Sequence, residues 1–330
     1  MKLLVLAAFI ALCAGHVIPD VPGDESRFVE DDNRYVWMAD DEGNQVLVDT
    51  QEPIDYEFIA RNGANNQYWL FTRQNPTNRQ VITNGNVNSI RNSNYRGNRP
   101  TKVIVHGWRN SGTTEMNPLI TSAFLAVQDC NVIVVDWSRL ASNINYNTAA
   151  AGVPSVGQFL GNFLVWLFNN GGGNWNQLHL VGFSLGAHVV GVAGRTAGGR
   201  PGRVTGLDPA GPGWPNNGNR LSRNAGRYVE AIHTNGRDLG IMNPSGDADF
   251  YPNGGRRQPG CGSTSCSHGR ANEFFAASVR NNHLAGLRCA DIREAENNNC
   301  RGSRFNMGNA IVGKSGSGLY AMTTRAAWPF

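Results

Sequence analysis

Ser184 lies in a motif whose residue types suit a nucleophile, Gly182-Phe183-Ser184-Leu185-Gly186. The apolar run before the motif predicts a strand, and the stretch of small residues after it predicts a helix. A turn that links them directly is so tight that glycine is needed on both sides of the serine. The serine hydroxyl would then project above the carboxyl end of a sheet, next to a helix N-terminus. The alternative is a glycine-rich turn without a function.

A serine nucleophile needs a base, and the base needs a carboxylate that orients it. Where this turn occurs, the chain order is Ser, then Asp or Glu, then His. Asp208 follows the next apolar run and is predicted to be the orienting acid. His268 and His283 come late enough in the chain to be the base, whereas His188 is predicted to be a packing residue one turn after Ser184.

The elements that position these residues can be predicted from apolar patterning. Short runs that are apolar on both faces predict buried strands of a parallel sheet at 102–105, 131–136, 178–182 and 204–207. Apolar residues at helical spacing predict a helix over 155–168, and 185–194 and 271–279 are also predicted to be helical. The alternation predicts the α/β class, with a mostly parallel central sheet and helices on both faces.

The first 57 residues differ in composition from the remainder. Residues 1–15 form a short apolar run that ends in small residues, which predicts a signal peptide, with a short buried helix as the alternative. Residues 16–57 hold 13 acidic side chains and two arginines, and we predict an acidic pro-segment or flexible arm there, or a solvated tail without a role. Residues 58–330 hold 26 basic and 12 acidic side chains and form the predicted globular domain.

The cysteines of an exported protein are expected to form disulfides. Short local loops favour disulfides between Cys261 and Cys266 and between Cys289 and Cys300, which leaves Cys130 as a buried, unreactive thiol. Zinc binding by Cys261, Cys266 and His268 is the alternative.

The basic side chains of the domain are almost all arginine. Residues 58–330 hold 24 arginines and two lysines, Lys102 and Lys314. Because arginine keeps its charge above pH 10, where lysine begins to lose its own, this bias suits an alkaline extracellular workplace such as a gut lumen. Codon bias is the alternative explanation.

Several motifs in a fixed order resemble the animal pancreatic-lipase family, most closely its short-lid, single-domain insect members and phospholipases A1. The resemblance covers residues 66–325, approximately, and rests on these stretches: His106-Gly107-Trp108, Val135-Asp136-Trp137, Gly182–His188, Gly206–Ala210, Asp249–Gly255 and Cys266–Arg270. It implies an α/β-hydrolase fold and a secreted enzyme that cleaves carboxylic esters of acyl lipids, a lipase, phospholipase A1 or galactolipase.

The resemblance also implies residue roles. Ser184 would be the nucleophile, Asp208 the orienting acid and His268 the general base, and the backbone N–H groups of Trp108 and Leu185 would form the oxyanion hole. The expected partner is a lipid, phospholipid or galactolipid at a membrane or micelle surface. No nucleic acid or cofactor is implied, and the expected state is a monomer.

Three departures from the family pattern refine these expectations. Four polar residues separate Cys261 from Cys266, where lipases have a long lid. The family's C-terminal β-sandwich is not expected here, and neither is a colipase-type protein cofactor. Ser222 and Ala225, near Arg220, replace the acidic calcium ligands, so no metal is expected. The alternatives are a lipid-binding or defence protein with vestigial activity, or a peptidase or thioesterase on the same fold.

Overall fold

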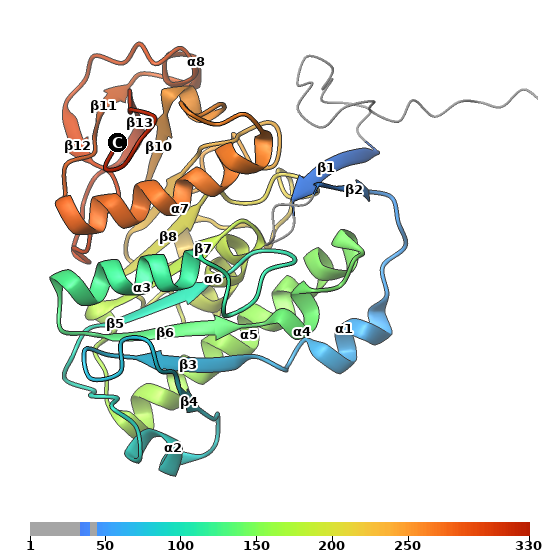
Figure 1. Ribbon diagram of the computed structural model, residues 1–330, viewed down its shortest axis with the longest axis vertical. Helices are drawn as coiled ribbons and strands as arrows, with labels where there is room; N and C mark the ends of the chain where they lie inside the picture. Colours follow the sequence, from blue (N-terminus) through green and yellow to red (C-terminus); the bar gives the residue numbers. More distant parts are fainter. Residues whose placement is uncertain (1–33, 40–44) are drawn as a thin grey trace, which may run out of the picture.

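A mixed sheet of eleven strands runs through the domain in the order β12-β11-β13-β10-β9-β8-β7-β5-β6-β3-β4 (Figure 1). The computed structural model describes residues 34–39 and 45–330, so the predicted signal peptide lies outside the described residues. The strands from β13 to β6 pair in parallel, and antiparallel strands flank them on both sides. This topology is the α/β-hydrolase fold that was expected.

Each predicted strand and helix is present, and the helices are longer than expected. The strands of the sheet are β3 (Gln67–Phe71), β4 (Gln80–Ile82), β5 (Thr101–Val105), β6 (Asn131–Asp136), β7 (Leu178–Phe183), β8 (Arg203–Leu207), β9 (Val229–Ile232), β10 (Ala248–Pro252), β11 (Ala285–Cys289), β12 (Arg304–Asn306) and β13 (Gly318–Met322). The α-helices are α1 (Tyr56–Asn62), α2 (Val87–Arg91), α3 (Met116–Val127), α4 (Ser138–Ala141), α5 (Tyr146–Gly171), α6 (Leu185–Thr196), α7 (Thr264–Asn281) and α8 (Ile292–Glu296).

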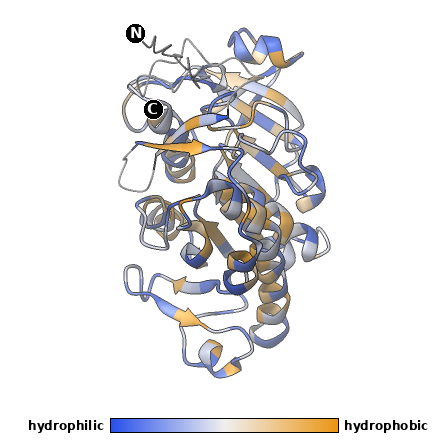
Figure 2. Ribbon diagram, turned by 90° about the vertical axis from the view of Figure 1, so that its right-hand side faces the viewer, coloured by the Kyte–Doolittle hydropathy of each residue, from blue (hydrophilic) through white to orange (hydrophobic). Residues whose placement is uncertain are grey.

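The central strands are apolar on both faces because helices cover both. In β5, Val103 and Val105 pack into a core shared with α5 and α6, whereas Ile104 between them packs into a core shared with α3 and α7. The two helix layers lie on opposite sides of the sheet (Figure 1). Hydrophobic residues follow the strands between these layers (Figure 2). Burial on both faces therefore explains the continuous apolar runs in the sequence.

Helix α5 is unusually long and apolar. By length and composition alone, its 26 residues would be enough to cross a membrane. Of its most apolar window, 56% is buried in the domain. Its inner side chains, among them Leu160 and Leu164, are fully buried in the core shared with α6. The apolar character of α5 is that of a core helix, and it is the one such helix in the described residues.

Part of the acidic segment packs on the domain. Strands β1 (Tyr35–Ala39) and β2 (Gln45–Asp49) form an antiparallel hairpin (Figure 1). Val36, Met38 and Val48 are 4–7% exposed and belong to the same core as α5 and α6. Farther along, the side chain of Asn145 donates to the carbonyl of Pro53 at 2.7 Å. These contacts join residues on both sides of the predicted boundary at residue 58.

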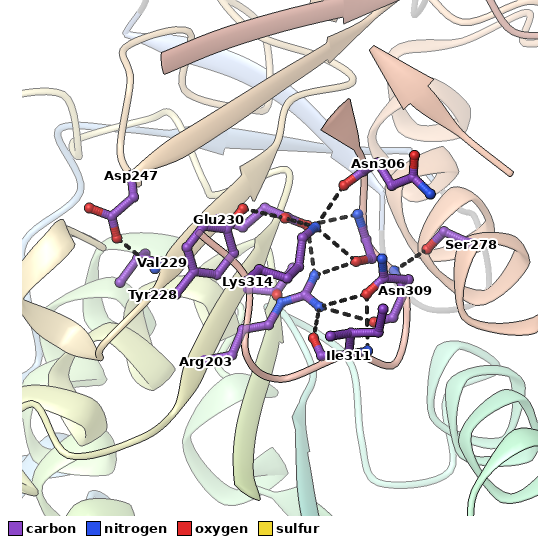
Figure 3. Close-up of polar contacts among 12 residues, drawn as sticks. Arg203, Tyr228, Val229, Glu230, Asp247, Ser278, Asn306, Asn309, Ile311 and Lys314 are labelled. Atoms are coloured by element: carbon purple, nitrogen blue, oxygen red, sulfur yellow. Dashed lines mark hydrogen bonds and ion pairs between the residues drawn. The ribbon is translucent and has the colours of Figure 1, made fainter. Parts of the chain in front are cut away.

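A buried ionic network fixes the loop before β13 against the sheet (Figure 3). The Glu230 carboxylate accepts from Arg203 at 2.8 Å and from Lys314 at 2.5 Å, and all three side chains are at most 4% exposed. Burial acts to raise the pKa of Glu230, but the two cations outweigh burial and lower it. Removing one partner of such a buried pair typically costs about 3–5 kcal/mol of stability. The network thus holds the segment around Lys314 against β8 and β9.

The cysteines follow the sequence-based expectation. Cys261 is bonded to Cys266 and Cys289 to Cys300. Cys130 is free and fully buried, and its burial raises the pKa of the thiol to about 11. A thiol that stays protonated and hidden from solvent is a poor nucleophile.

Candidate active site

Ser184 occupies a strained turn between β7 and α6. Its backbone has φ 55° and ψ −123°, outside the regions that side-chain-bearing residues prefer. A Cβ at Gly182 would lie 2.1 Å from the carbonyl oxygen of Gly186, and one at Gly186 would lie 2.3 Å from the carbonyl oxygen of Val105. Both glycines of the motif are therefore required by close backbone contacts, as expected for a turn of this kind.

Asp208 follows β8, the neighbour of β7. Because Phe183 and Leu207 are paired in parallel register, the residues that follow them lie at the same edge of the sheet. Asp208 is fully buried, and its Oδ2 lies 2.5 Å from Nδ1 of His268. Its Oδ1 accepts from the backbone N–H groups of Thr234, at 2.7 Å, and Asn235, at 3.1 Å. These donors fix the carboxylate, and the carboxylate fixes the imidazole.

His268 lies in the second turn of α7 and shares a cavity with Ser184. The cavity has a volume of about 460 Å³ and is also lined by Trp108 and Phe183. The ring of Phe183 packs against that of His268 at a centroid distance of 4.6 Å. Ser184 and His268 are 4% and 8% exposed, so both side chains are accessible only through this cavity. The structure therefore brings the predicted nucleophile, acid and base together.

The segment after β5 runs directly against Ser184. Strands β5 and β7 are parallel neighbours, with Val105 paired to Gly182. A Cβ at Gly107 would lie 2.9 Å from the Cβ of Ser184, so the chain passes too close for a larger residue. Trp108 comes next in this segment, and Leu185 is the first residue of α6, where N–H groups have no partner within the helix. The two predicted oxyanion donors thus belong to adjacent segments at the cavity.

Gly240 is a further residue that the site requires, and no pattern in the sequence pointed to it. A Cβ at this position would lie 2.5 Å from both carboxylate oxygens of Asp208. The loop that carries Gly240 also contributes Leu239 to the cavity wall. A side chain at residue 240 would displace the carboxylate that holds His268.

The remaining histidines have other surroundings. His188 is buried, stacks on Trp214 and is bonded at both ring nitrogens, and burial lowers its pKa to about 3. His283 is exposed and bonded to the carbonyl of Pro329. His233 forms a second buried pair with Asp249, at 2.9 Å, outside the cavity lining. His188 is a packing residue as expected, and His268 is the histidine that lines the cavity.

Two unrelated segments form the cavity rim. Ser263 caps α7 by accepting from the N–H of Cys266, so the short stretch between the cysteines is the first turn of that helix. The hairpin lies against this turn, because Nε2 of Gln45 donates to Oγ of Ser265 at 2.9 Å. Gln45 and Met38 both line the cavity. The hairpin therefore contributes to the wall beside a helix turn that is too short to act as a lid.

The residues around Arg220 do not fit a calcium ion. The guanidinium of Arg195 donates to the carbonyl oxygens of Arg220, at 3.0 Å, and Asn219, at 2.9 Å, and lies 3.2 Å from Oγ of Ser222. Ca²⁺ needs six to eight oxygen ligands and usually carboxylates. Here a side-chain cation already binds the oxygens. No cluster of metal-ligating side chains occurs elsewhere in the described part of the chain.

Comparisons with known proteins agree with this geometry. Residues 37–326 match the family described as Lipase. Lipase member H-A of Xenopus laevis is 36% identical over 277 residues, which cover 80% of this chain and 59% of that protein. Pancreatic triacylglycerol lipase of Myocastor coypus is 32% identical over 264 residues, 72% of this chain and 57% of that protein. Human pancreatic lipase-related protein 2 is 32% identical over 278 residues, which cover 76% of this chain and 59% of that protein.

Two facts follow from the extent of these matches. The chain spans a little over half the length of the curated relatives that it matches. The family match begins at residue 37, earlier than the motifs that suggested residue 66. The acidic segment therefore does not lie wholly upstream of the family match, and the hairpin belongs to the matched region.

Proposed function

The chain belongs to the lipase family, and from this premise we propose that it is a secreted serine hydrolase that cleaves carboxylic esters of acyl lipids. The observation that carries the proposal is the contact between Asp208 and His268 beside the cavity that His268 shares with Ser184. An imidazole held by a buried carboxylate, in the same cavity as a serine hydroxyl, is the arrangement that acyl transfer requires.

In the proposed reaction, Oγ of Ser184 attacks the ester carbonyl while Nε2 of His268 takes its proton. Asp208 keeps the other ring nitrogen, Nδ1, protonated and in place. The backbone N–H groups of Trp108 and Leu185 stabilise the oxyanion of the tetrahedral intermediate. His268 then gives the proton to the leaving alcohol, and water attacks the acyl-enzyme by the same sequence of proton transfers.

The substrate is proposed to be a polar acyl lipid, with phospholipase A1 or galactolipase activity. The rim turn at Ser263–Cys266 is polar and short, so access to Ser184 does not require a large lid to move. Met116 and Leu119 give the cavity an apolar wall for an acyl chain. Triacylglycerol, phosphatidylcholine and monogalactosyl diacylglycerol, with positional analysis of the products, form the assay panel that separates these activities.

A fluorophosphonate probe tests the proposed function. The probe is expected to label the protein at Ser184, because it reacts with serines that a neighbouring base activates. Mass spectrometry of the labelled peptide identifies the residue. Absence of labelling, or labelling at another serine, would contradict a serine hydrolase mechanism at this site and favour a lipid-binding protein on the same fold.

We also propose that the protein acts in an alkaline environment, and the burial of both lysines supports this proposal. Lys102 is fully buried and the Lys314 side chain is 4% exposed, so arginine supplies the strong positive charge at the described surface. Burial lowers the pKa of Lys102 to about 8, from an ordinary value of 10.5. Cys130 opposes this lowering, and the guanidinium of Arg203 adds to it.

Stability is therefore expected to rise with pH just above 8. Below pH 8 the buried ammonium of Lys102 lowers the free energy of unfolding. Between pH 8 and 10.5 Lys102 is deprotonated in the folded protein but still protonated in the unfolded chain, so the free energy of unfolding rises with pH. One pH unit within that window adds about 1.4 kcal/mol to the free energy of unfolding. Cys130 acts oppositely above pH 9, because its thiol ionises first in the unfolded chain. The net gain is thus expected between pH 8 and 9.

Urea unfolding of the wild type and of Lys102→Met at pH 7, 8 and 9 measures this contribution. The variant lacks the titrating group and should gain about 1 kcal/mol less than the wild type between pH 8 and 9. Equal pH dependence in the two proteins would show that the pKa of Lys102 is not lowered in the folded state, so that its ammonium keeps its charge through pH 9.

A further inference from the structure

Acidic side chains are the charged groups at the outer part of the catalytic cavity. Glu115, at the start of α3, and Glu273, two turns into α7, both line it. Glu115 is exposed and the Glu273 side chain is 42% exposed, whereas Ser184 is only 4% exposed. No lysine or arginine lines the cavity among the described residues. An ester that reaches Ser184 therefore leaves its head group close to two carboxylates.

The two carboxylates are near enough to interact. Burial raises the pKa of Glu273, the neighbouring Arg270 opposes this rise, and Glu115 adds to it. Arg270 pairs with Glu273 at 3.1 Å, but its guanidinium faces inward, where the side chain is 9% exposed and also bonds the carbonyl of Ala326. Glu115 makes no ion pair with another described residue. Among the described residues, no cation is therefore paired with the carboxylate of Glu115 at the mouth.

Arg109 is a further cation in the segment that carries Trp108. Arg109 follows Trp108, and its guanidinium lies 5.8 Å from the centre of the Trp108 ring. It is not among the residues that line the cavity. Around Glu115, the lining residues are polar and uncharged, with Asn110 and Thr114 on one side and Asn272 on the other. These groups can form hydrogen bonds with hydroxyl-bearing or zwitterionic head groups.

We propose that Glu115 and Glu273 select against acyl lipids with an anionic head group, so that the cavity favours head groups without net negative charge. The inference rests on the proposed function, because it concerns the substrates of the same cavity. At a separation of about 10 Å and an effective dielectric of about 20, one carboxylate disfavours an anion by at least roughly tenfold. The effect weakens as salt screens the charges.

The net charge of the outer surface has the opposite effect on the binding of anionic lipids. Residues 58–330 carry 26 basic and 12 acidic side chains, so the exterior favours anionic membranes. Adsorption to a membrane and selection in the cavity must therefore be measured separately. Short-chain substrates below their critical micelle concentration report on the cavity alone.

The test compares dihexanoyl phosphatidylcholine, which has no net charge, with dihexanoyl phosphatidylglycerol, which is an anion, both as monomers. We expect the wild-type kcat/KM for phosphatidylcholine to exceed that for phosphatidylglycerol by about tenfold or more. The double variant Glu115→Gln with Glu273→Gln should bring this ratio close to one. Raising the salt concentration should lower the ratio of the wild type and leave that of the double variant unchanged.

Charge reversal gives an outcome that misfolding cannot imitate. Glu115→Lys should raise kcat/KM for phosphatidylglycerol above the wild-type value. Glu57→Gln removes one carboxylate from α1, where it pairs with the exposed Arg61 away from the cavity, and should keep the wild-type ratio.

The outcomes separate this inference from the proposed function. A wild-type ratio near one, or a ratio that the Glu115 and Glu273 variants leave unchanged, overturns the inference while hydrolysis itself supports the function. If the wild type hydrolyses neither lipid nor the uncharged ester p-nitrophenyl butyrate, the proposed function is wrong, and the inference is overturned with it.

Discussion

Replacing Ser184 by alanine is expected to lower kcat for ester hydrolysis by about 10⁶. The substitution removes the oxygen that forms the acyl-enzyme, and His268 and Asp208 have no other use in the proposed reaction. Removal of the nucleophile alone costs about as much as removal of the whole unit. The activity that remains should be that of the oxyanion donors and substrate binding alone, about 10³–10⁴ over water.

The measurement is steady-state hydrolysis of p-nitrophenyl butyrate and of dihexanoyl phosphatidylcholine, with protein from which contaminating esterases have been removed. Ser122→Ala is the matched control, because Ser122 lies on the exposed side of α3 and bonds the carbonyl of Leu119. The control should keep wild-type activity. Retention of more than about one per cent of kcat in Ser184→Ala would show that another group performs the chemistry.

The sequence could predict the proposed catalytic centre because its parts follow local rules. Strands β7 and β8 are apolar on both faces, and each ends directly before Ser184 or Asp208. Since carboxyl ends of neighbouring parallel strands lie together, the two residues had to be close. The tight turn at Ser184 is recorded in its flanking glycines, whose close backbone contacts leave no room for a Cβ.

The long-range contacts of the same site had no comparable signal in the sequence. Gly240 makes room for the Asp208 carboxylate across 32 positions of sequence, and a glycine in a loop is ordinarily attributed to a turn. The packing of the hairpin was not predicted, for a related reason. The acidic composition of residues 16–57 indicated a pro-segment or flexible arm, and it drew attention away from Val36 and Met38, which alternate at strand spacing and pack into the core. This alternation of apolar residues is the pattern of a strand with one buried face.

The surroundings of the two buried lysines were equally difficult to predict from the sequence. The scarcity of lysine was visible in the composition, and 102–105 was predicted to be a buried strand, but nothing local showed what would surround the ammonium groups of Lys102 and Lys314 in the core. Lys102 lies in β5, and its ammonium contacts the carbonyl of Ala310 and the face of Phe124. Those partners come from segments more than 20 and 200 residues away. The pH dependence of stability is therefore a property of the fold.

Asp208→Asn is the second substitution with a large expected effect, a loss of about 10⁴ in kcat. The backbone N–H groups of Thr234 and Asn235 donate to Oδ1 of Asp208, so the amide oxygen of asparagine should take this position. The amide nitrogen would then face Nδ1 of His268, where the carboxylate Oδ2 now lies. Two donors cannot face each other, so Nδ1 would lose its proton and Nε2 would carry it. A protonated Nε2 cannot accept the proton of Ser184.

Asp249→Asn is the matched control, because Asp249 also binds a buried histidine, His233, at 2.9 Å and also accepts from backbone N–H groups. Both variants should lose stability when a buried carboxylate becomes an amide. Only Asp208→Asn should lose kcat by orders of magnitude, and its rate of labelling by a fluorophosphonate should fall in parallel. Equal losses of kcat in the two variants would mean that destabilisation, and not the tautomer of His268, limits the reaction.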